Sequence, residues 1–270
     1  MSRVVLITGS TDGIGRATAR ALAAAGMSVI VHGRSKVKVD AALAELSAEL
    51  PGAVLEGVAF DLARLDAVRS GAAQLLERVP ELHILINNAG IFAGERVLTD
   101  DGVELTLAVN YLGHFVLTEL LAPRLIACAT SEPSRVINVA SIAHTRGRIH
   151  LDDLSLASAW TGYAAYAQSK LANVMHAMTL ADQHDPAKLL AFSLHPGVVG
   201  TKLLRQGFGP ITGAPTDAGA RTSVRLAGGD ITDPSGSYFS DGVATPPAAA
   251  ARDAQARTAL WEASRQLARV

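Results

Sequence analysis

Short apolar runs alternate along the chain with longer stretches whose apolar residues recur at helical spacing. Most of the short runs are continuously hydrophobic, which is typical of strands that are covered on both faces of a sheet. This alternation predicts stacked βαβ units, and therefore an α/β fold in which a doubly wound parallel sheet of about seven strands carries helices on both faces. The predicted strands are residues 4–7, 28–32, 54–60, 83–86, 135–139, 189–194 and 237–239, and the predicted helices are 14–25, 36–50, 64–78, 103–128, 164–183, 216–227 and 252–268.

No internal repeat or linker divides the chain, so residues 1–270 are expected to form a single domain. One segment, 198–215, follows a predicted strand, is rich in Gly and Pro and has no clear periodicity. A long irregular segment inside a compact domain is usually functional, so we expect a lid on the substrate side there, with a plain surface connection as the alternative. Residues 245–251, which include Pro246 and Pro247, are predicted to form a turn into the last helix.

Composition narrows the class of protein. Apolar residues make up 49% of the chain and charged residues 18%, as in globular proteins rather than disordered ones. The net charge of −1 comes without a basic stripe or an acidic tail, which argues against a nucleic-acid partner. The single cysteine, Cys128, cannot form an internal disulfide. Such cysteine usage is typical of a reducing compartment, so a cytoplasmic location is expected.

The chain is not expected to enter a membrane. Its first apolar run, 4–7, is too short for a signal peptide and leads directly into a glycine-rich turn. The most apolar helical stretch, 103–128, contains polar residues such as Glu104 and His114 and is interrupted by Pro123. We therefore interpret it as a buried core helix and not as a membrane span.

The glycine-rich turn comes after the first predicted strand and opens the first helix. Gly9, Gly13 and Gly15 stand in the spacing G-x-x-x-G-x-G, one residue wider than the usual dinucleotide-binding fingerprint. Glycines let the backbone turn tightly and approach a ligand, and a helix N-terminus presents free N–H groups to a phosphate. The turn therefore predicts a Rossmann-type cofactor site whose contacts are Gly9, Ser10, Thr11, Asp12, Gly13, Ile14 and Gly15.

The residues that follow the second strand bear on which nicotinamide cofactor binds. An acidic residue at this place binds the ribose 2′-hydroxyl of NAD, and none is present in His32-Gly33-Arg34-Ser35. The guanidinium of Arg34 suits a 2′-phosphate by its charge and by its fork of donors, and Ser35 could assist it. We expect NADP(H) to be preferred, with NAD(H) not excluded. The alternative is that Arg34 is a plain solvated arginine.

Two more motifs follow the third and fourth strands. Asp61, with Leu62 after it, could accept a hydrogen bond from the adenine amino group. The small residues in Asn88-Ala89-Gly90 would let the ribose of the cofactor lie against the backbone. Each motif also has a purely structural alternative, since Asp61 could cap the next helix and the preceding Asn87 could form a turn.

Candidate catalytic residues come later in the chain. Ser141 ends the fifth strand, and Tyr166 and Lys170 stand at positions i and i+4 of a predicted helix, so they share a face. A free phenol has a pKa near ~10, and the neighbouring ammonium is expected to lower it, which would make Tyr166 a usable general acid/base. Ser141 could donate a hydrogen bond to the substrate oxygen. The eight histidines show no metal-ligand spacing, so no metal is expected.

Together these motifs resemble the short-chain dehydrogenase/reductase family along nearly the whole chain. The matching pieces are residues 8–15, Asp61, 87–90, Asn110, Ser141, Tyr166 to Lys170 and Pro196-Gly197 followed by Thr201. The resemblance implies that Ser141, Tyr166 and Lys170 are catalytic. It also implies that Asn110 completes a tetrad by holding a water in a proton relay from Lys170. The implied cofactor contacts near the nicotinamide are Tyr166, Lys170, Pro196, Gly197, Val199 and Thr201.

Several stretches resemble one branch of that family, the retinol dehydrogenases and the WW-domain-containing oxidoreductase. These stretches are residues 110–117, 141–144, 151–154 and 165–173, and the gap of 25 residues between Ser141 and Tyr166 is similar to that branch. The resemblance implies an NADP(H)-dependent oxidoreductase that interconverts an aldehyde or ketone and an alcohol by hydride transfer, with Tyr166 as general acid/base. Two alternatives remain open, a non-catalytic module that senses NADP(H) and a member of the family that reduces a C=C bond.

The substrate is expected to be a small carbonyl or alcohol, and an apolar one. Five apolar residues flank the predicted site: Phe92, Ile142, Leu203, Leu204 and Phe208. Members of the family often pair through long helices, here 103–128 and 164–183, so the resemblance also implies a possible homodimer or homotetramer.

Overall fold

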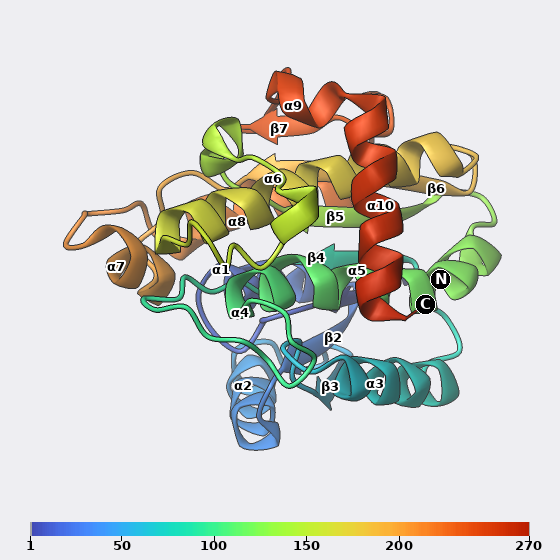
Figure 1. The fold of residues 1–270 in the computed structure, drawn as a ribbon. Helices are drawn as coiled ribbons and strands as arrows, with labels where there is room; N and C mark the ends of the chain where they lie inside the picture. The colour runs from blue at the N-terminus through green and yellow to red at the C-terminus, as the bar shows by residue number, and fades with distance from the viewer. Residues whose placement is uncertain (1, 270) are drawn as a thin grey trace.

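The computed structural model describes residues 2–269 and is built around one eight-stranded sheet (Figure 1). The strands lie in the order β3-β2-β1-β4-β5-β6-β7-β8, and every neighbouring pair is parallel except β7 with β8. Because the strand order reverses between β1 and β4, the crevice at the carboxyl ends of these strands is the place where such sheets bind ligands. The strands are β1 Val4–Ile7, β2 Ser28–Gly33, β3 Leu55–Ala59, β4 Ile84–Asn87, β5 Ser134–Val139, β6 Leu189–His195, β7 Tyr238–Ser240 and β8 Val243–Ala244.

Helices cover both faces of the sheet, as the sequence predicts. One face is packed against α1, α2 and α8, and the other against α3, α5 and α6. The helices are α1 Gly13–Ala24, α2 Lys36–Glu49, α3 Leu65–Arg78, α4 Leu105–Leu107, α5 Gly113–Cys128, α6 Gly162–Gln183, α7 Lys202–Phe208, α8 Thr216–Gly228, α9 Ala249–Arg252 and α10 Ala254–Ala268. The predicted α/β class is therefore confirmed.

Successive residues of a strand pack into two separate hydrophobic cores, one on each face of the sheet. In β1, Leu6 belongs to the core on one face, whereas Val5 and Ile7 belong to the core on the other. Val136 and Ile137 of β5 divide in the same way. Both faces of the sheet are thus apolar, which is why the strands read as continuous hydrophobic runs in the sequence.

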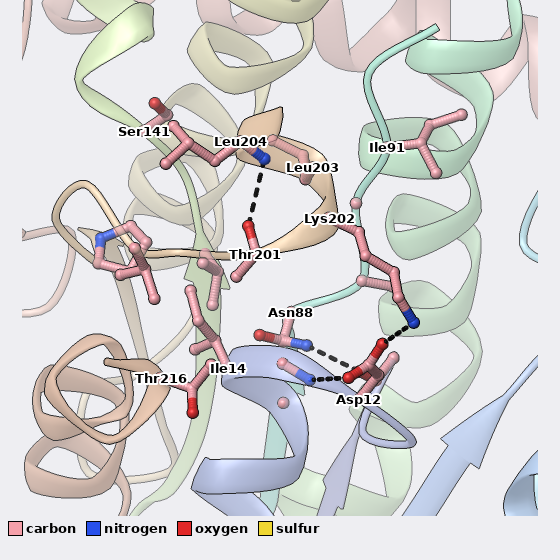
Figure 2. Close-up of a pocket in the computed structure, with 18 of the residues that line it drawn as sticks. Asp12, Ile14, Asn88, Ile91, Ser141, Thr201, Lys202, Leu203, Leu204 and Thr216 are labelled. Atoms are coloured by element: carbon pink, nitrogen blue, oxygen red, sulfur yellow. Dashed lines mark hydrogen bonds and ion pairs between the residues drawn. The ribbon is translucent and has the colours of Figure 1, made fainter. Parts of the chain in front are cut away.

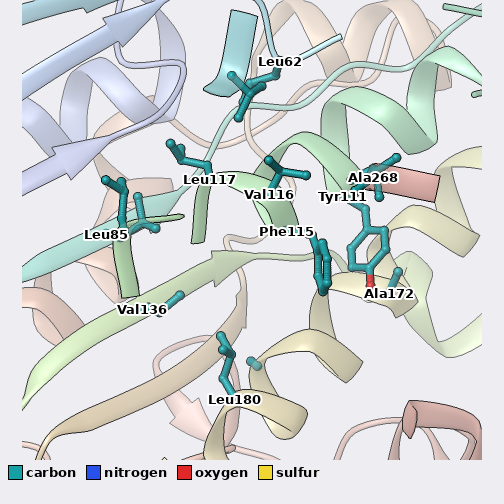
Figure 3. Packing of buried hydrophobic residues seen from close by; sticks show 14 of the residues in the cluster. Leu62, Leu85, Tyr111, Phe115, Val116, Leu117, Val136, Ala172, Leu180 and Ala268 are labelled. Atoms are coloured by element: carbon teal, nitrogen blue, oxygen red, sulfur yellow. The ribbon is translucent and has the colours of Figure 1, made fainter. Parts of the chain in front are cut away.

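One continuous helix of 24 residues runs from Leu105 to Cys128 through α4, a π-helical turn at Ala108–Leu112 and α5. By length and composition alone it could cross a membrane, since its most apolar stretch of 18 residues has a mean hydropathy of 1.4. However, 78% of that stretch is buried inside the protein. Figure 3 shows its Tyr111 and Phe115 within the packed core. The expectation of a buried core helix is confirmed.

The C-terminal helix α10 lies across this long helix and α6. The ring centroids of Trp261 and Phe115 are 4.9 Å apart, and the hydroxyls of Ser264 and Tyr111 are 2.8 Å apart. Arg257 of α10 also donates to Asp182 of α6 at 2.7 Å. Apolar surface of the two long helices is therefore covered by a segment of the same chain.

The expected elements needed correction mainly after residue 198. The segment 198–215 is not wholly irregular, because it contains α7, and the predicted turn 245–251 contains the start of the short helix α9. The last predicted strand lies one residue further along, and the two-residue β8 pairs with it in antiparallel fashion. Thr201 explains the start of α7, since its Oγ1 accepts a hydrogen bond from the Leu204 amide at 3.2 Å.

Candidate active site

A cleft with a volume of about 1160 Å³ opens at the carboxyl ends of the central strands (Figure 2). Its walls come from the turn between β1 and α1, the segments after β2, β3, β4 and β5, the first turns of α6, and the chain from His195 through α7. Every motif that the sequence places after a strand therefore faces one space.

The glycine-rich turn is held in place by close packing. Gly9 has a φ of +65°, and a Cβ there would lie 2.8 Å from the Cα of Ala89. Asn88 secures the turn, because its Nδ2 donates to the backbone oxygens of Thr8 at 2.7 Å and Gly9 at 3.3 Å. A side chain at position 9 would force the turn and the segment after β4 apart.

The start of α1 can accept a phosphate. Asp12 caps the helix, with its Oδ1 accepting from the Gly13 amide at 2.8 Å. The next two amides, of Ile14 and Gly15, have no hydrogen-bond partner among residues 2–269, and both residues line the cleft. Two free N–H groups at the positive end of a helix dipole suit an anionic group such as the pyrophosphate of a dinucleotide.

Basic residues surround the far end of the cleft, where the segment after β2 lies. Arg34 is exposed, lines the cleft and makes no hydrogen bond or ion pair with the other described residues. Lys38, in the first turn of α2, lines the same part of the wall. Asp61 also faces the cleft, and its Oδ1 accepts from the Ala63 amide at 2.9 Å.

Ser141, Tyr166 and Lys170 meet at the opposite end of the cleft. Thr161 caps α6, accepting from the Ala164 amide at 3.0 Å, so that Tyr166 and Lys170 lie one turn apart on the face toward the cleft. The Nζ of Lys170 donates to the Val139 carbonyl at 2.8 Å and lies 5.6 Å from the centre of the Tyr166 ring. The Ser141 hydroxyl accepts from the Ala143 amide at 3.2 Å.

A family model described as short chain dehydrogenase matches residues 3–208. The chain belongs to the short-chain dehydrogenase/reductase family. It is 38% identical to retinol dehydrogenase 12 of Bos taurus over an alignment 275 residues long, which covers 98% of this chain and 86% of that protein. It therefore lies in the retinol dehydrogenase-like branch, as the sequence motifs predict.

Solved structures agree with this assignment. A protein from Mycobacterium Paratuberculosis matches with a TM-score of 0.82 and 36% identity, over 99% of this chain and 94% of that one. A structure from Beutenbergia cavernae, described as an NAD(P) dependent gluconate 5-dehydrogenase with bound NADP, matches with a TM-score of 0.70 and 25% identity, over 88% of this chain and 94% of that one. The short-chain dehydrogenase/reductase family binds a nicotinamide cofactor, and the cleft described above fits one.

The expected asparagine of the dehydrogenase tetrad is buried behind the cleft wall. Asn110 lies in the π-helical turn, where its Oδ1 accepts from the Ile91 amide at 2.8 Å and its Nδ2 donates to the Ile91 carbonyl at 3.1 Å and to Ser169 Oγ at 3.0 Å. A Cβ on Gly90 would lie 3.5 Å from both Asn110 Oδ1 and Lys170 Nζ. The structure thus brings Asn110 next to Lys170, although Asn110 itself does not line the cleft.

The pKa values of the dehydrogenase pair differ from the sequence-based expectation. Burial raises the pKa of Tyr166 to about 12, and the Ser141 side chain opposes this rise only in part. Burial also lowers the pKa of Lys170 to about 8. The expected lowering of the Tyr166 pKa by Lys170 was wrong, because the loss of solvent around the phenol dominates. Tyr166 therefore holds its proton at neutral pH.

Two of the predicted cofactor contacts do not face the cleft of this dehydrogenase. Ser10 is fully buried, donates to the Ile7 carbonyl at 2.7 Å and accepts from the His32 amide at 3.0 Å, so it stabilises the turn from inside. Ser35 precedes α2 and also lies outside the lining. The other predicted contacts line the cleft: Gly9, Thr11, Asp12, Gly13, Ile14, Gly15, Arg34, Asp61, Leu62, Asn88, Ala89, Gly90, Tyr166, Lys170, Pro196, Gly197, Val199 and Thr201.

Sequence reasoning also missed residues that line the cleft, notably Lys38, Tyr163 and His195. Lys38 could have been found, because it is a basic residue in the first turn of the helix that is predicted to follow Arg34. His195 ends β6 directly before Pro196, and the sequence alone does not show whether the last side chain of a strand faces the cleft. Within residues 2–269 there is no cluster of three or more His, Cys, Asp or Glu side chains that could hold a metal ion.

The segment after β6 closes over the cleft. Lys202, at the start of α7, donates to Asp12 across the opening at 2.5 Å (Figure 2). Further along α7, the Phe208 ring lies 5.9 Å from the Tyr166 ring, and Leu203 packs against the same small cluster. The segment 198–215 therefore contacts both the glycine-rich turn and Tyr166, and its role as a lid stays a prediction.

Proposed function

We propose that this protein is an NADP(H)-dependent oxidoreductase that interconverts an apolar aldehyde or ketone and the corresponding alcohol, with Tyr166 as general acid/base. The observation that carries this proposal is the meeting of Ser141, Tyr166 and Lys170 in the wall of a cleft whose other end suits a dinucleotide. A module that only senses the cofactor would not need a buried acid/base at this place.

The proposed chemistry divides between cofactor and protein. A bound nicotinamide supplies or accepts the hydride. Tyr166, which holds its proton at neutral pH, donates that proton to the carbonyl oxygen of the substrate as negative charge develops there. Ser141 donates a hydrogen bond to the same oxygen. Lys170, beside the phenol, bears a charge that favours the tyrosinate during the transfer.

The preference for NADP(H) rests on Arg34 and Lys38. Both cations line the end of the cleft after β2, and no acidic residue follows that strand. A guanidinium can bind a 2′-phosphate with two hydrogen bonds, and a nearby ammonium adds charge. Replacing Arg34 by alanine is therefore expected to raise the KM for NADPH by about 10- to 100-fold and to leave the KM for NADH within about twofold.

Steady-state kinetics with both cofactors checks this prediction. Lys38→Ala is the matched variant, and it should raise the KM for NADPH less, since an ammonium lacks the fork of donors. Equal increases in the KM for NADPH and for NADH after Arg34→Ala would show that Arg34 does not read the 2′-phosphate.

The apolar character of the substrate is supported by aromatic rings around Tyr166. The ring of Phe92 lies 5.6 Å from the Tyr166 ring and 5.4 Å from the Phe208 ring, and Leu203 and Phe208 cover the tyrosine from α7. The relative retinol dehydrogenase 12 is named for an apolar alcohol, which agrees with such a lining. A substrate with a long apolar chain would replace the contacts that these side chains make with each other.

Replacing Phe208 by alanine tests this substrate class. The KM for a long-chain aldehyde such as decanal should rise about tenfold, because an aromatic contact with the chain is lost, whereas the KM for propanal should change little. Kinetics with the two aldehydes at saturating NADPH measure the difference. A similar change for both substrates would place Phe208 in the lid without a role in substrate choice.

The proposed activity itself is tested by following NADPH oxidation against aliphatic, aromatic and retinoid-like aldehydes and ketones, with NADH in parallel. Turnover of carbonyl compounds would support the proposal. Tight NADPH binding without turnover would favour the sensing module. Turnover confined to α,β-unsaturated compounds, with a saturated carbonyl as product, would favour reduction of a C=C bond.

A further inference from the structure

His114 is a buried polar residue for which the proposed chemistry has no use. It stands in the first turn of α5, is 1% exposed, and lies between the cofactor turn and the tetrad. Its Nε2 is 2.8 Å from Thr8 Oγ1, and its Nδ1 is 3.1 Å from the carbonyl oxygen of Asn110. The ring thus joins the residue before Gly9 to the tetrad asparagine.

The partners of His114 determine where its ring proton lies. A carbonyl oxygen can only accept a hydrogen bond, so Nδ1 carries the hydrogen that is donated to Asn110. In the neutral ring Nε2 then accepts, and the Thr8 hydroxyl donates to it. The same Thr8 oxygen accepts from the amides of Asn88 at 2.9 Å and Ala89 at 3.0 Å. The Thr8 hydroxyl also lies 3.3 Å from the Ile86 carbonyl, but with Nδ1 protonated its hydrogen goes to the closer acceptor, Nε2 at 2.8 Å.

This chain of hydrogen bonds connects the two ends of the cleft. Asn88 and Ala89 line the cofactor end and hold the glycine-rich turn, whereas Asn110 lies in the π-helical turn beside Lys170. The side chain of Asn110 is already occupied by Ile91 and Ser169, so its backbone carbonyl is the group that His114 orients. π-Helical turns of this kind occur frequently at functional sites.

The surroundings keep His114 neutral, as this directional chain requires. Burial lowers the pKa of His114 to about 3; the hydrogen bond to the Asn110 carbonyl opposes this lowering only in part, and the charge of Lys170 reinforces it. An apolar residue at this position would leave the Asn110 carbonyl without its ring donor and Thr8 Oγ1 without its ring acceptor. Thr8 could then donate only to the more distant Ile86 carbonyl, at 3.3 Å, and the loss of buried hydrogen bonds is costly inside a protein.

We propose that His114 is a positioning residue: its Nδ1 holds the backbone carbonyl of Asn110, whose side chain lies near Lys170, and its Nε2 fixes the Thr8–Ala89 side of the cofactor turn. The first half of this assignment rests on the proposed proton-transfer function, and the second half rests only on cofactor binding.

Two half-conservative variants separate the two contacts. The amide of asparagine reaches about as far as imidazole Nδ1, so His114→Asn keeps a donor for Asn110 but loses Thr8. The amide of glutamine reaches about as far as Nε2, so His114→Gln keeps a partner for Thr8 but loses Asn110. His114→Gln should lower kcat about tenfold and shift its pH profile, with the Kd for NADPH within about twofold. His114→Asn should weaken NADPH binding about tenfold and leave kcat at saturating cofactor within about twofold.

His176 provides the matched control. It is 2% exposed, its Nδ1 is 3.2 Å from Asn138 Nδ2, and it contacts neither Asn110 nor Thr8 through a hydrogen bond. The same two substitutions at His176 should lower the melting temperature without separating kcat from the Kd. If both His114 variants change kcat and the Kd in parallel, or behave like the His176 variants, the proposal is overturned.

A readout independent of turnover comes from nitrogen NMR of ¹⁵N-histidine-labelled protein, assigned with His114→Gln. His114 should show a protonated Nδ1 and an unprotonated Nε2, and it should stay neutral at pH 5. The opposite tautomer, or a ring that is charged at pH 5, would overturn the proposal.

If the wild-type protein turned over no carbonyl compound, the proposed function would fail. The tautomer and the loss of NADPH binding in His114→Asn would still decide whether His114 positions the cofactor turn.

Discussion

Replacing Tyr166 by phenylalanine is expected to lower kcat by about 10²- to 10⁴-fold, because the change removes only the hydroxyl that we propose as the proton donor. The phenol is buried, packs between Phe92 and Phe208, and lies beside Ser141 and Lys170. Phenylalanine preserves these ring contacts, so the melting temperature should change little. Steady-state kinetics and thermal unfolding of the same preparation measure both effects.

Tyr163 offers the control for this experiment. It stands three residues earlier on α6, also lines the cleft, and packs on Phe208 at 6.3 Å, but it is 40% exposed and has no lysine one turn after it. Tyr163→Phe should therefore retain kcat within a few-fold of the wild-type value. A Tyr166→Phe protein that kept more than a tenth of the wild-type kcat would refute the assigned acid/base.

Replacing Lys170 by methionine is expected to abolish most activity while making the protein more stable. The ammonium is fully buried, and burial lowers its pKa from an ordinary 10.5 to about 8, which corresponds to about 3 kcal/mol of unfavourable desolvation at neutral pH. Losing the hydrogen bond to the Val139 carbonyl offsets about 1 kcal/mol of this. The net gain in the free energy of unfolding at pH 7 should therefore be about 1–2 kcal/mol.

The pH dependence of stability gives the sign of this effect. An unfolded lysine keeps its proton up to about pH 10.5, whereas Lys170 in the folded protein loses it near pH 8. Between these values unfolding takes up a proton, so the stability of the wild-type protein should rise with pH through that window. Urea unfolding from pH 7 to 10 should show this rise in the wild-type protein and not in Lys170→Met. Lys188, an exposed lysine that donates to the Ala129 carbonyl at 3.3 Å, is the control, and Lys188→Met should leave the rise unchanged.

The parts of the fold that the sequence predicts well are those whose apolar residues form a clear pattern. Strands such as β1 and β5 read clearly because both of their faces are apolar. The helix α7 is only seven residues long and has no buried residue, so no periodic pattern marks it. The helix depends on the Thr201 cap and on contacts that Leu203 and Phe208 make with the cluster around Tyr166, which is far away in the chain. The two-residue β8 is likewise too short for a pattern.

The site was predictable as far as topology fixes it. Motifs that follow parallel strands must meet at one edge of the sheet, so the positions of Asp61 and Ser141 could be inferred before any coordinates. Within the glycine-rich turn, however, the backbone sends Ser10 inward while its neighbours face the cleft. The raised pKa of Tyr166 was equally hidden, because helical spacing shows that Lys170 is near but not how far both groups are removed from water.

The position of α10 has a consequence for truncated forms of the chain. Trp261 and Ser264 shield Phe115 and Tyr111, so a protein ending before Ala254 would expose a continuous aromatic and aliphatic surface on its two longest helices. Large exposed apolar patches drive association. The last helix thus covers apolar surface that a neighbouring molecule would otherwise cover, and a protein without this helix is expected to aggregate or self-associate.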